Sequence, residues 1–355
     1  MSELRKMLKI LKRGLFPGPD KITKIWIGVT DECNSRCTTC NTWKNPKRND
    51  LLTPDEIYKV LSDPILKDVD LILNSGGEPT TREDLFEFIK SEHLALPKAR
   101  LQISTNGLKA DYLCGIVWEL LELYPNLKLS IGTSLDGISE EHDSIRGIKG
   151  NYESTIRMIK LLKTLQDNYG KERLQIGFGT VLTPRTSKSI PALKQYAKDN
   201  DLEFLVQWFN RSDFYNNKDK DYITTDKERQ IVKDCNYSIL TDMWLNWMDG
   251  KSIKFDCYAL RTFFALKCNG DVVPCLTHWD YVIGNVKKHA DPEGHLRPMT
   301  ISEVLSGSRL KAPCVKDCEG CLNSWGVGWS MESTVKPYFK YYLKHPIKLL
   351  RQLLL

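Results

Sequence analysis

The chain lacks the features that mark a membrane-spanning or an exported protein. No apolar run in its 355 residues reaches the roughly 18 residues that a membrane span needs. The first residues lack the apolar core and the small-residue cleavage site of a secretory signal. Internal repeats and low-complexity segments are also missing, which argues against solenoid and fibrous classes. With 41% hydrophobic and 27% charged residues, the composition predicts a globular, cytoplasmic protein.

A strong charge of one sign is also missing from most of the chain. The net charge is +6, but residues 1–19 carry +4 and residues 336–355 carry +5, so the body between them carries −3. A body without basic excess argues against nucleic acid as a partner. Basic ends with apolar or aromatic faces can lie on an anionic membrane, so peripheral contact with the inner membrane face is one interpretation of them. The alternative is that both ends dock on the body as ordinary terminal helices.

Cysteine is abundant instead, with eleven residues in the chain. An odd number in a long chain without an export signal makes a disulfide framework a poor explanation, and metal ligation a better one. Nine of the cysteines fall into two groups, and Cys114 and Cys235 stand alone. The two groups are Cys33, Cys37 and Cys40 near the start, and Cys257, Cys268, Cys275, Cys314, Cys318 and Cys321 near the end.

Strand-like apolar runs alternate with amphipathic helical stretches up to about residue 210. Such alternation predicts an α/β fold with a parallel sheet, closed or partly closed into a barrel. The expected strands are Lys24–Val29, Val69–Leu73, Arg100–Ser104, Lys128–Ser134, Leu174–Leu182 and Glu203–Trp208. The expected helices span about 54–61, 83–93, 109–123, 151–168 and 187–199.

The pattern changes after residue 210. A polar stretch over 211–222 leads to an expected helix near 226–248. A hairpin follows, with strands Arg261–Lys267 and Asp271–Pro274 and a turn at Asn269-Gly270. The later cysteines come next, so we expect a small second module whose core is organised by metal.

The first motif with chemical meaning is Cys33-x3-Cys37-x2-Cys40, directly after the first expected strand. Three thiolates on one loop can bind one metal centre, and three cysteines on a four-iron cluster leave one iron open for a ligand. The alternative is a structural zinc ion with a distant fourth ligand.

The second motif is Ser75-Gly76-Gly77-Glu78-Pro79, directly after the second expected strand. Two glycines allow the backbone to approach a ligand closely. Glu78 adds a carboxylate at the edge of the sheet where ligands of α/β proteins bind. Alone, this motif indicates only a turn.

Together, the two motifs resemble the radical SAM superfamily. Ser104-Thr105-Asn106-Gly107, Ser134-Leu135-Asp136-Gly137 and His142-Asp143-Ser144-Ile145-Arg146-Gly147 follow later strands in the manner of members with extra cluster domains. The resemblance covers roughly residues 24–208 and implies a partial (β/α)6 TIM-like barrel. We therefore expect a basic segment (1–23), a barrel (24–210), a linker helix with an auxiliary-cluster module (211–330) and a basic tail (331–355).

The resemblance also implies cofactors and the residues that hold them. Cys33, Cys37 and Cys40 would ligate a 4Fe–4S cluster whose fourth iron is chelated by S-adenosylmethionine (SAM). Eight other residues would bind SAM: Gly76, Gly77 and Glu78 at its amino group, Ser104 and Asn106 at its ribose or methionine part, Ser134 and Asp136 nearby, and Arg146 at its carboxylate. The alternative is that Asn106 and Asp136 only form turns and Arg146 is a surface charge.

One position departs from the family pattern. Many members carry an aromatic residue directly before the third cysteine, and here that residue is Thr39. The backbone of Thr39 could still contact the adenine, and Trp43 could replace the missing ring or belong to the core.

The later cysteines resemble the twitch module, a shortened form of the SPASM domain. Cys257, then Gly270-x4-Cys275, then Cys318-x2-Cys321 match it, and no cysteine follows. The resemblance implies one auxiliary 4Fe–4S cluster on Cys257, Cys275, Cys318 and Cys321. Cys268 and Cys314 are spare: either could replace one of the four or be a buried thiol. The alternative is a structural zinc ion.

The implied function is that of a radical SAM enzyme. Such an enzyme takes one electron from an external flavodoxin or ferredoxin, cleaves SAM and abstracts hydrogen from an unactivated carbon. A small molecule, sugar or lipid is the favoured substrate, and a peptide is the alternative. A non-catalytic metal-binding scaffold is the alternative of another class. No catalytic acid or base is identified.

Overall fold

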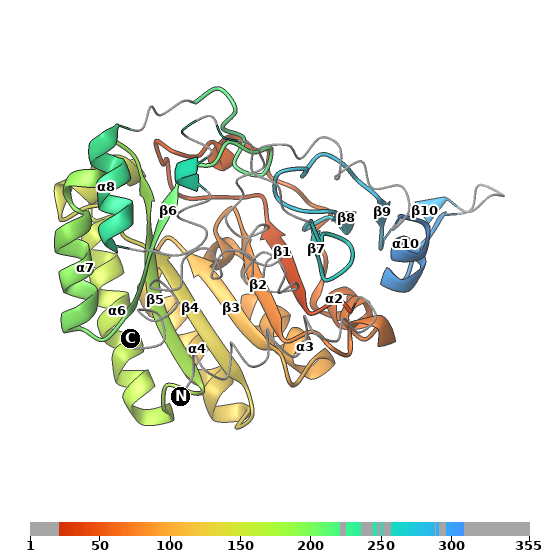
Figure 1. Cartoon of the computed structure of the whole chain (residues 1–355). Coiled ribbons are helices and arrows are strands. Elements are labelled where there is room, and N and C mark those ends of the chain that lie inside the picture. Colours follow the sequence, from red (N-terminus) through yellow and green to blue (C-terminus); the bar gives the residue numbers. More distant parts are fainter. Residues whose placement is uncertain are drawn as a thin grey trace, which may run out of the picture.

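The computed structural model describes an open α/β barrel joined to a small β-rich module (Figure 1). A parallel sheet forms the barrel, and its strands match the expected ones closely. The described residues are 21–220, 225–235, 244–246, 249, 251, 257–287, 289–290 and 296–308.

Six parallel strands lie side by side in the order of the chain, with β6 at the open edge of the sheet. Three have the predicted bounds, and the other three run one to three residues further toward the site. The strands are β1 (Lys24–Thr30), β2 (Leu71–Gly76), β3 (Arg100–Thr105), β4 (Lys128–Ser134), β5 (Leu174–Leu182) and β6 (Glu203–Trp208).

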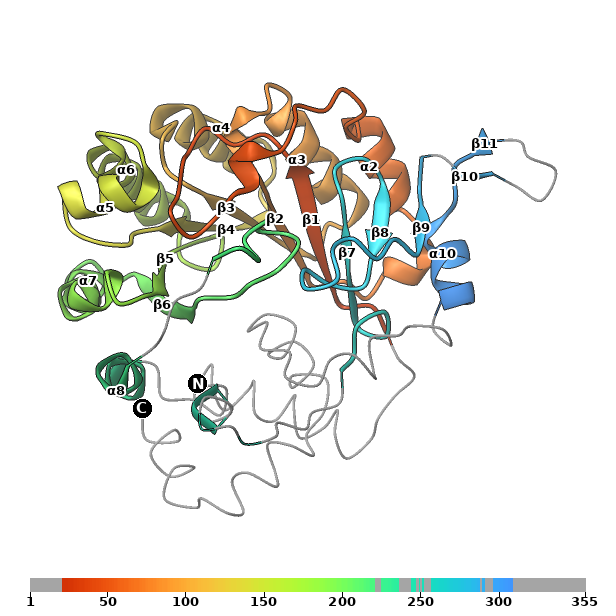
Figure 2. The same cartoon turned by 90° about the horizontal axis from the view of Figure 1, so that it is seen from above.

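Helices cover the outer face of this sheet, and the inner face is turned toward the loop over 209–220 and the small module (Figure 2). The sequence missed two of them, the short helices α5 and α10. The helices are α2 (Pro54–Leu61), α3 (Leu85–Ala95), α4 (Ala110–Leu123), α5 (Glu140–Arg146), α6 (Asn151–Tyr169), α7 (Ile190–Asp199), α8 (Asp226–Cys235) and α10 (Ile301–Ser308). Short 3-10 turns span Thr42–Lys44, Pro64–Leu66, Pro79–Thr81 and Thr186–Lys188.

Local sequence explains where these helices begin. Helix α2 starts with a complete capping box, because Thr53 Oγ1 accepts from Glu56 N–H and the Glu56 carboxylate accepts from Thr53 N–H. Pro54 occupies the first helical position, where its missing N–H costs nothing. Helix α5 is short and mostly polar, and it has no apolar stripe. The hydrophobic periodicity of the sequence therefore does not predict it.

Two apolar cores lie on opposite sides of the sheet. Alternate residues of β1, such as Ile25 and Ile27, pack outward against the helices in the larger core. Trp26 points to the inner side, where it packs with Phe214, Phe263 and further residues of the small module. The small module therefore fills the β1 end of the barrel interior.

The small module joins the barrel through the sheet itself. The predicted hairpin is confirmed as β7 (Phe263–Leu266) paired antiparallel with β8 (Asp271–Val273), and Gly270 turns with a positive φ of 87°. Strand β7 also pairs in parallel with β1, which the sequence did not predict. Strand β9 (Gly284–Asn285) extends the sheet, whereas β10 (His289–Ala290) and β11 (Leu296–Arg297) form a separate pair.

Several predictions fall outside the described residues. They include most of both basic ends, most of the expected 226–248 helix after residue 235, and Cys314, Cys318 and Cys321. Among the helices that the structure does describe, none is both long and apolar enough to cross a membrane.

Candidate functional site

The three clustered cysteines lie on the loop that follows β1, with Cys37 buried and the other two half-buried. Burial, together with the nearby charges of Glu78, Cys37 and Cys40, raises the pKa of Cys33 to about 12. Burial likewise raises the pKa of Cys40, against the hydrogen bonds from Thr42. Thiols that influence one another in this way resist deprotonation together, unless a metal centre compensates their charge.

Helix α5 holds one side of this cysteine loop. The N–H groups of Arg36 and Thr38 donate to the carbonyls of Arg146 (2.9 Å) and Ile145 (2.8 Å). Gly147 caps the helix with a positive φ of 69°, and a Cβ there would lie 2.6 Å from the Arg36 carbonyl oxygen. The glycine is therefore required for the helix end to approach the loop this closely.

The polar segment 211–220 holds the other side of the loop. Asn217 Nδ2 donates to the Thr39 carbonyl (3.0 Å), and Lys220 Nζ donates to the Thr38 carbonyl (2.6 Å). Asn41 N–H donates to the Tyr215 carbonyl (2.9 Å). The sequence indicated only a polar linker here, since single Asn and Lys side chains give no signal for the partner they find.

The Gly76-Gly77 pair docks on the start of the same loop. A Cβ on Gly76 would lie 2.3 Å from the Thr30 carbonyl oxygen, and one on Gly77 would lie 2.0 Å from that of Glu32. The N–H of Gly77 donates to the Thr30 carbonyl (2.7 Å), and the N–H of Glu78 donates to the Glu32 carbonyl (2.8 Å). Both glycines are thus fixed by close backbone packing, which positions the cysteine loop against β2.

The carboxylate of Glu78 is buried and accepts four hydrogen bonds. The donors are the N–H and hydroxyl of Thr80, the hydroxyl of Thr105 (2.7 Å) and the N–H of Asn106 (2.7 Å). Burial raises the pKa of Glu78, against these hydrogen bonds. Glu78 therefore ties the loops after β2 and β3 together, and its contact with the amino group of SAM stays a prediction.

Asn106 ties the cysteine loop to the end of β3. Its Nδ2 donates to Asn34 Oδ1 (2.7 Å) and Ser35 Oγ (3.0 Å), which lie between the first two cysteines. Its Oδ1 accepts from Leu108 N–H (3.0 Å), which is the turn contact expected of an Asn before Gly. The side chain thus forms a turn and also orders the site.

Asp136 is buried and forms an ion pair with the partly buried Arg146 beside Cys37. Arg146 Nη2 lies 2.6 Å from Asp136 Oδ2, and Nη1 lies 3.5 Å from Cys37 Sγ. The other oxygen of Asp136 accepts from Thr180 and Val181 of β5. Burial lowers the pKa of Arg146, but Asp136 and Cys37 more than compensate, so the pKa is raised. Arg146 is therefore no surface charge.

His142 supports this pair from α5. Burial lowers its pKa to about 4, and the charge of Arg146 lowers it too. The neutral ring accepts the N–H of Asp136 at Nδ1 (3.1 Å). His142 thereby fixes the turn that presents Asp136.

Ser104 and Ser134 lie at the ends of β3 and β4, half-buried on the inner face of the sheet. Trp43 lies beside the cysteine loop, where its Nε1 donates to the Cys40 carbonyl (3.1 Å) and Arg36 lies 5.0 Å over its ring. The role of these residues and of Thr39 toward SAM stays a prediction.

Two of the later cysteines pack against the same apolar core, and a third does not. Cys257 and Cys275 are half-buried and pack against the inner core that contains Trp26 and Phe263. Cys268 is buried elsewhere, where burial and a hydrogen bond to Asp31 raise its pKa to about 12. This separation favours Cys268 as the buried thiol rather than a ligand.

Two family models match the chain. Residues 27–184 match the radical SAM superfamily, and residues 257–322 match the iron–sulfur cluster-binding domain called SPASM. Residues 27–184 therefore belong to the radical SAM superfamily. The membership of this segment explains why the cysteine loop, the Gly-Gly-Glu motif and the Asn106 turn meet at the carboxyl ends of the strands.

Curated relatives match part of this radical SAM protein. It is 29% identical to the Fe-coproporphyrin III synthase of Methanosarcina barkeri, over 50% of the chain and 41% of that relative. It is 28% identical to the pre-heme d1 synthase of Dinoroseobacter shibae, over 52% and 43%. The chain thus spans less than half the length of these relatives.

Solved structures share the fold. SuiB of Streptococcus suis bound to S-adenosylmethionine superposes with a TM-score of 0.56 at 17% identity, over 91% of this chain and 69% of SuiB. The enzyme anSMEcpe with bound AdoMet gives a TM-score of 0.56 at 16% identity, over 93% and 98%. The partial barrel with a C-terminal module is thereby confirmed.

The family brings 4Fe–4S clusters and SAM as cofactors, and the cysteine loop fits such a cluster. Its donors are three soft thiols on one loop, with no imidazole among them, which suits iron–sulfur ligation better than a hard cation. Within the described ranges, no three metal-ligating side chains converge on the position of one ion. In a four-iron cluster each thiolate binds a different iron, so the spacing required is wider.

Proposed function

We propose that this chain cleaves SAM reductively at a 4Fe–4S cluster held by Cys33, Cys37 and Cys40. The observation that supports this most is the way the cysteine loop is held. Backbone bonds from α5, side chains of segment 211–220 and the glycines after β2 all fix its main chain and leave its thiols together. A loop ordered from three sides is what a cluster site needs, because its ligands must be positioned before the metal binds.

When bound, the cluster and SAM supply a 5′-deoxyadenosyl radical that abstracts a hydrogen atom from the substrate. The residues of the chain bind and orient SAM and the substrate and shield them from water. Arg146 Nη1 lies 3.5 Å from Cys37 Sγ, so the guanidinium is at the position where it would meet the carboxylate of SAM beside the cluster. Gly76 and Gly77 offer backbone at the amino group, and Ser104, Asn106 and Ser134 line the same end of the sheet.

The favoured substrate is a small molecule, sugar or lipid, as the sequence indicated. The alternative is a peptide, since SuiB shares the fold and has been solved bound to its precursor peptide SuiA. The curated relatives named for porphyrin chemistry point to a third class of small molecule. In each case the substrate lies between the barrel and the auxiliary module.

The remaining proposals concern the auxiliary site and the partners. Cys257 and Cys275, with Cys318 and Cys321, hold one further 4Fe–4S cluster. An external flavodoxin or ferredoxin supplies the electron in the cytoplasm, and the basic ends contact the inner membrane face. The chain divides into the segments 1–23, 24–210, 211–330 and 331–355.

The direct test is SAM cleavage under anaerobic conditions. Reconstituted protein with dithionite and SAM should release 5′-deoxyadenosine and methionine, measured by liquid chromatography and mass spectrometry. The variant Cys37→Ala should release none. The matched control is Cys114→Ala, because Cys114 is also a buried thiol but lies on α4 with its Sγ against the Met158 carbonyl. Equal release from the two variants, or none from the wild type, would contradict the proposal.

A further inference from the structure

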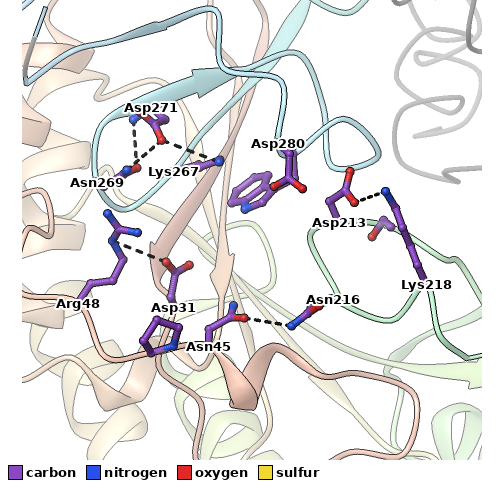
Figure 3. Close-up of a pocket in the computed structure, with 13 residues that line it drawn as sticks. Asp31, Asn45, Arg48, Asp213, Asn216, Lys218, Lys267, Asn269, Asp271 and Asp280 are labelled. Atoms are coloured by element: carbon purple, nitrogen blue, oxygen red, sulfur yellow. Dashed lines mark hydrogen bonds and ion pairs between the residues drawn. The ribbon is translucent and has the colours of Figure 1, made fainter.

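A pocket of about 350 Å³ lies beside the cysteine loop, where three segments meet (Figure 3). Asp31 and the stretch 45–48 flank the loop, the segment 212–218 forms the second wall, and residues 267–280 of the β7–β8 hairpin and the turn after it form the third. Asp31 stands two residues before Cys33. The barrel and the auxiliary module therefore share this pocket, at the position proposed for the substrate.

Most of the residues that line the pocket are polar. Of the thirteen, only Pro46 and Trp279 are apolar. Four carboxylates and three amide side chains are among the others. A lipid chain would leave these groups without hydrogen bonds, so the walls disfavour an apolar ligand.

The cations of the pocket are already paired with carboxylates. Lys218 forms an ion pair with Asp213, and Lys267 Nζ lies 3.8 Å from Asp271 Oδ2. Arg48 lies 3.9 Å from Asp31 and donates two bonds to Asp50. An anionic ligand such as a phosphate would have to break these pairs and lie close to the remaining carboxylates, so an anion is disfavoured.

The pocket also offers no strand edge to a peptide. Asp271 belongs to β8, which is hydrogen-bonded to β7 on one side and to β9 on the other. A peptide that binds by strand addition needs a free edge. The carboxylates and amides of the pocket walls can accept and donate hydrogen bonds, which suits a ligand with many hydroxyl groups.

We propose that this pocket binds a neutral, hydroxyl-rich part of the substrate, of the size of a sugar ring. Carboxylates such as Asp280 and amides such as Asn45 and Asn216 accept from and donate to its hydroxyl groups, and Trp279 gives the apolar wall. The volume lies at the small end of the usual range for ligand sites, about 300–1,000 Å³. This inference rests on the proposed function, since it names the substrate class of that site.

Calorimetric titration of the reconstituted protein tests it, with glucose, galactose, mannose, N-acetylglucosamine and maltose as probes. Glycylglycine and pyrophosphate serve as the peptide and anion probes. At least one sugar should bind saturably. Loss of one hydrogen-bonding group should weaken it about tenfold, so Asp280→Ala and Asn45→Ala are the test variants. Asp280 is exposed and Asn45 is half-buried, so both variants should fold.

The control variant is Asp111→Ala, which removes an exposed ion pair with Arg157 on the outer helices and should bind the sugar as the wild type does. The inference is overturned if no sugar of the set binds, if both pocket variants bind it unchanged, or if glycylglycine or pyrophosphate binds in its place. SAM cleavage by the same wild-type preparation separates the two proposals. Cleavage without sugar binding removes only this inference, whereas sugar binding without cleavage removes only the proposed activity.

Discussion

Gly77 and Gly115 differ in how closely other atoms surround them, so we expect substitution by alanine to have opposite effects at the two positions. A Cβ at Gly77 would lie 2.0 Å from a backbone oxygen of the cysteine loop, whereas nothing lies within 4 Å of a Cβ at Gly115 in α4. We expect Gly77→Ala to cost about 1–3 kcal/mol and to reduce the iron retained after reconstitution. Gly115→Ala should stabilise the protein by about 0.5–1 kcal/mol, because alanine is the better helix former.

Urea unfolding and iron analysis of both variants measure these effects. Equal iron contents in the two variants would show that the approach of Gly77 to the loop is unimportant for the cluster.

Glu92 on α3 should make the stability depend on pH. Burial raises its pKa to about 8, although a hydrogen bond from Asn74 (2.7 Å) and the charge of Arg82 lower it. Between about pH 4.5 and pH 8 the folded protein keeps a proton that the unfolded chain releases, so this contribution to stability is lost as the pH rises. Glu92→Gln removes the effect and keeps an acceptor for Asn74.

One pKa unit corresponds to about 1.4 kcal/mol, so the variant should gain about 2 kcal/mol or more on the wild type between pH 5 and pH 8. Urea unfolding at these two pH values is the measurement. Parallel changes in the two proteins would contradict the assignment.

At the scale of elements, the segment 211–220 acts as a clamp on the cysteine loop, because its side chains donate to the carbonyls of Thr38 and Thr39. Asn217 is buried, donates to the carbonyls of Thr39 and Asn210, and accepts from Ser212 N–H. Asn217→Ala leaves these three backbone groups without their partner, at a cost of about 1–3 kcal/mol. We expect iron to leave this variant several times faster in the presence of a chelator, followed by the visible absorption of the cluster.

Asn200→Ala is the comparison, since the side chain of Asn200 donates to the Tyr196 carbonyl at the end of α7. Loss of iron at the wild-type rate from Asn217→Ala would mean that the clamp is unnecessary.

Elements with a regular pattern could be predicted from the sequence, and contacts between distant segments could not. The bounds of β4, β5 and β6 follow from alternating apolar runs, and α2 follows from its cap. Helix α5 has no such periodicity, and the pairing of β7 with β1 joins residues more than 230 positions apart. Local propensity says nothing about such a pairing, because it depends on how the whole chain folds.

The same contrast holds within the site. The cysteine spacing and the Gly-Gly-Glu motif are visible in the sequence, because the chemistry requires those residue types in that order. The contact of Arg146 with Cys37 and the four donors to Glu78 are set by tertiary structure. The sequence therefore identifies the site residues before it can assign them their partners.

At the scale of the whole molecule, the proposed contact with a membrane depends on the basic ends. The last 21 residues combine five basic side chains with aromatic and leucine residues and contain no acid after Val335. Deletion of 335–355 should release the protein from anionic liposomes, because each basic residue near such a surface contributes about 1 kcal/mol. Sedimentation with liposomes of phosphatidylserine and of neutral lipid measures this. Binding that persists after the deletion, or that ignores lipid charge, would contradict membrane contact through this end.

The most direct measurement of the central claim is the iron and sulfide content of anaerobically reconstituted protein. The account predicts about eight of each per chain, two four-iron clusters, and about four in a variant with Cys33, Cys37 and Cys40 all changed to Ala. A value of about four in the wild type that vanishes in this variant would keep the SAM-binding cluster and remove the auxiliary one. Zinc without iron in the wild type, or unchanged iron in the triple variant, would contradict the account.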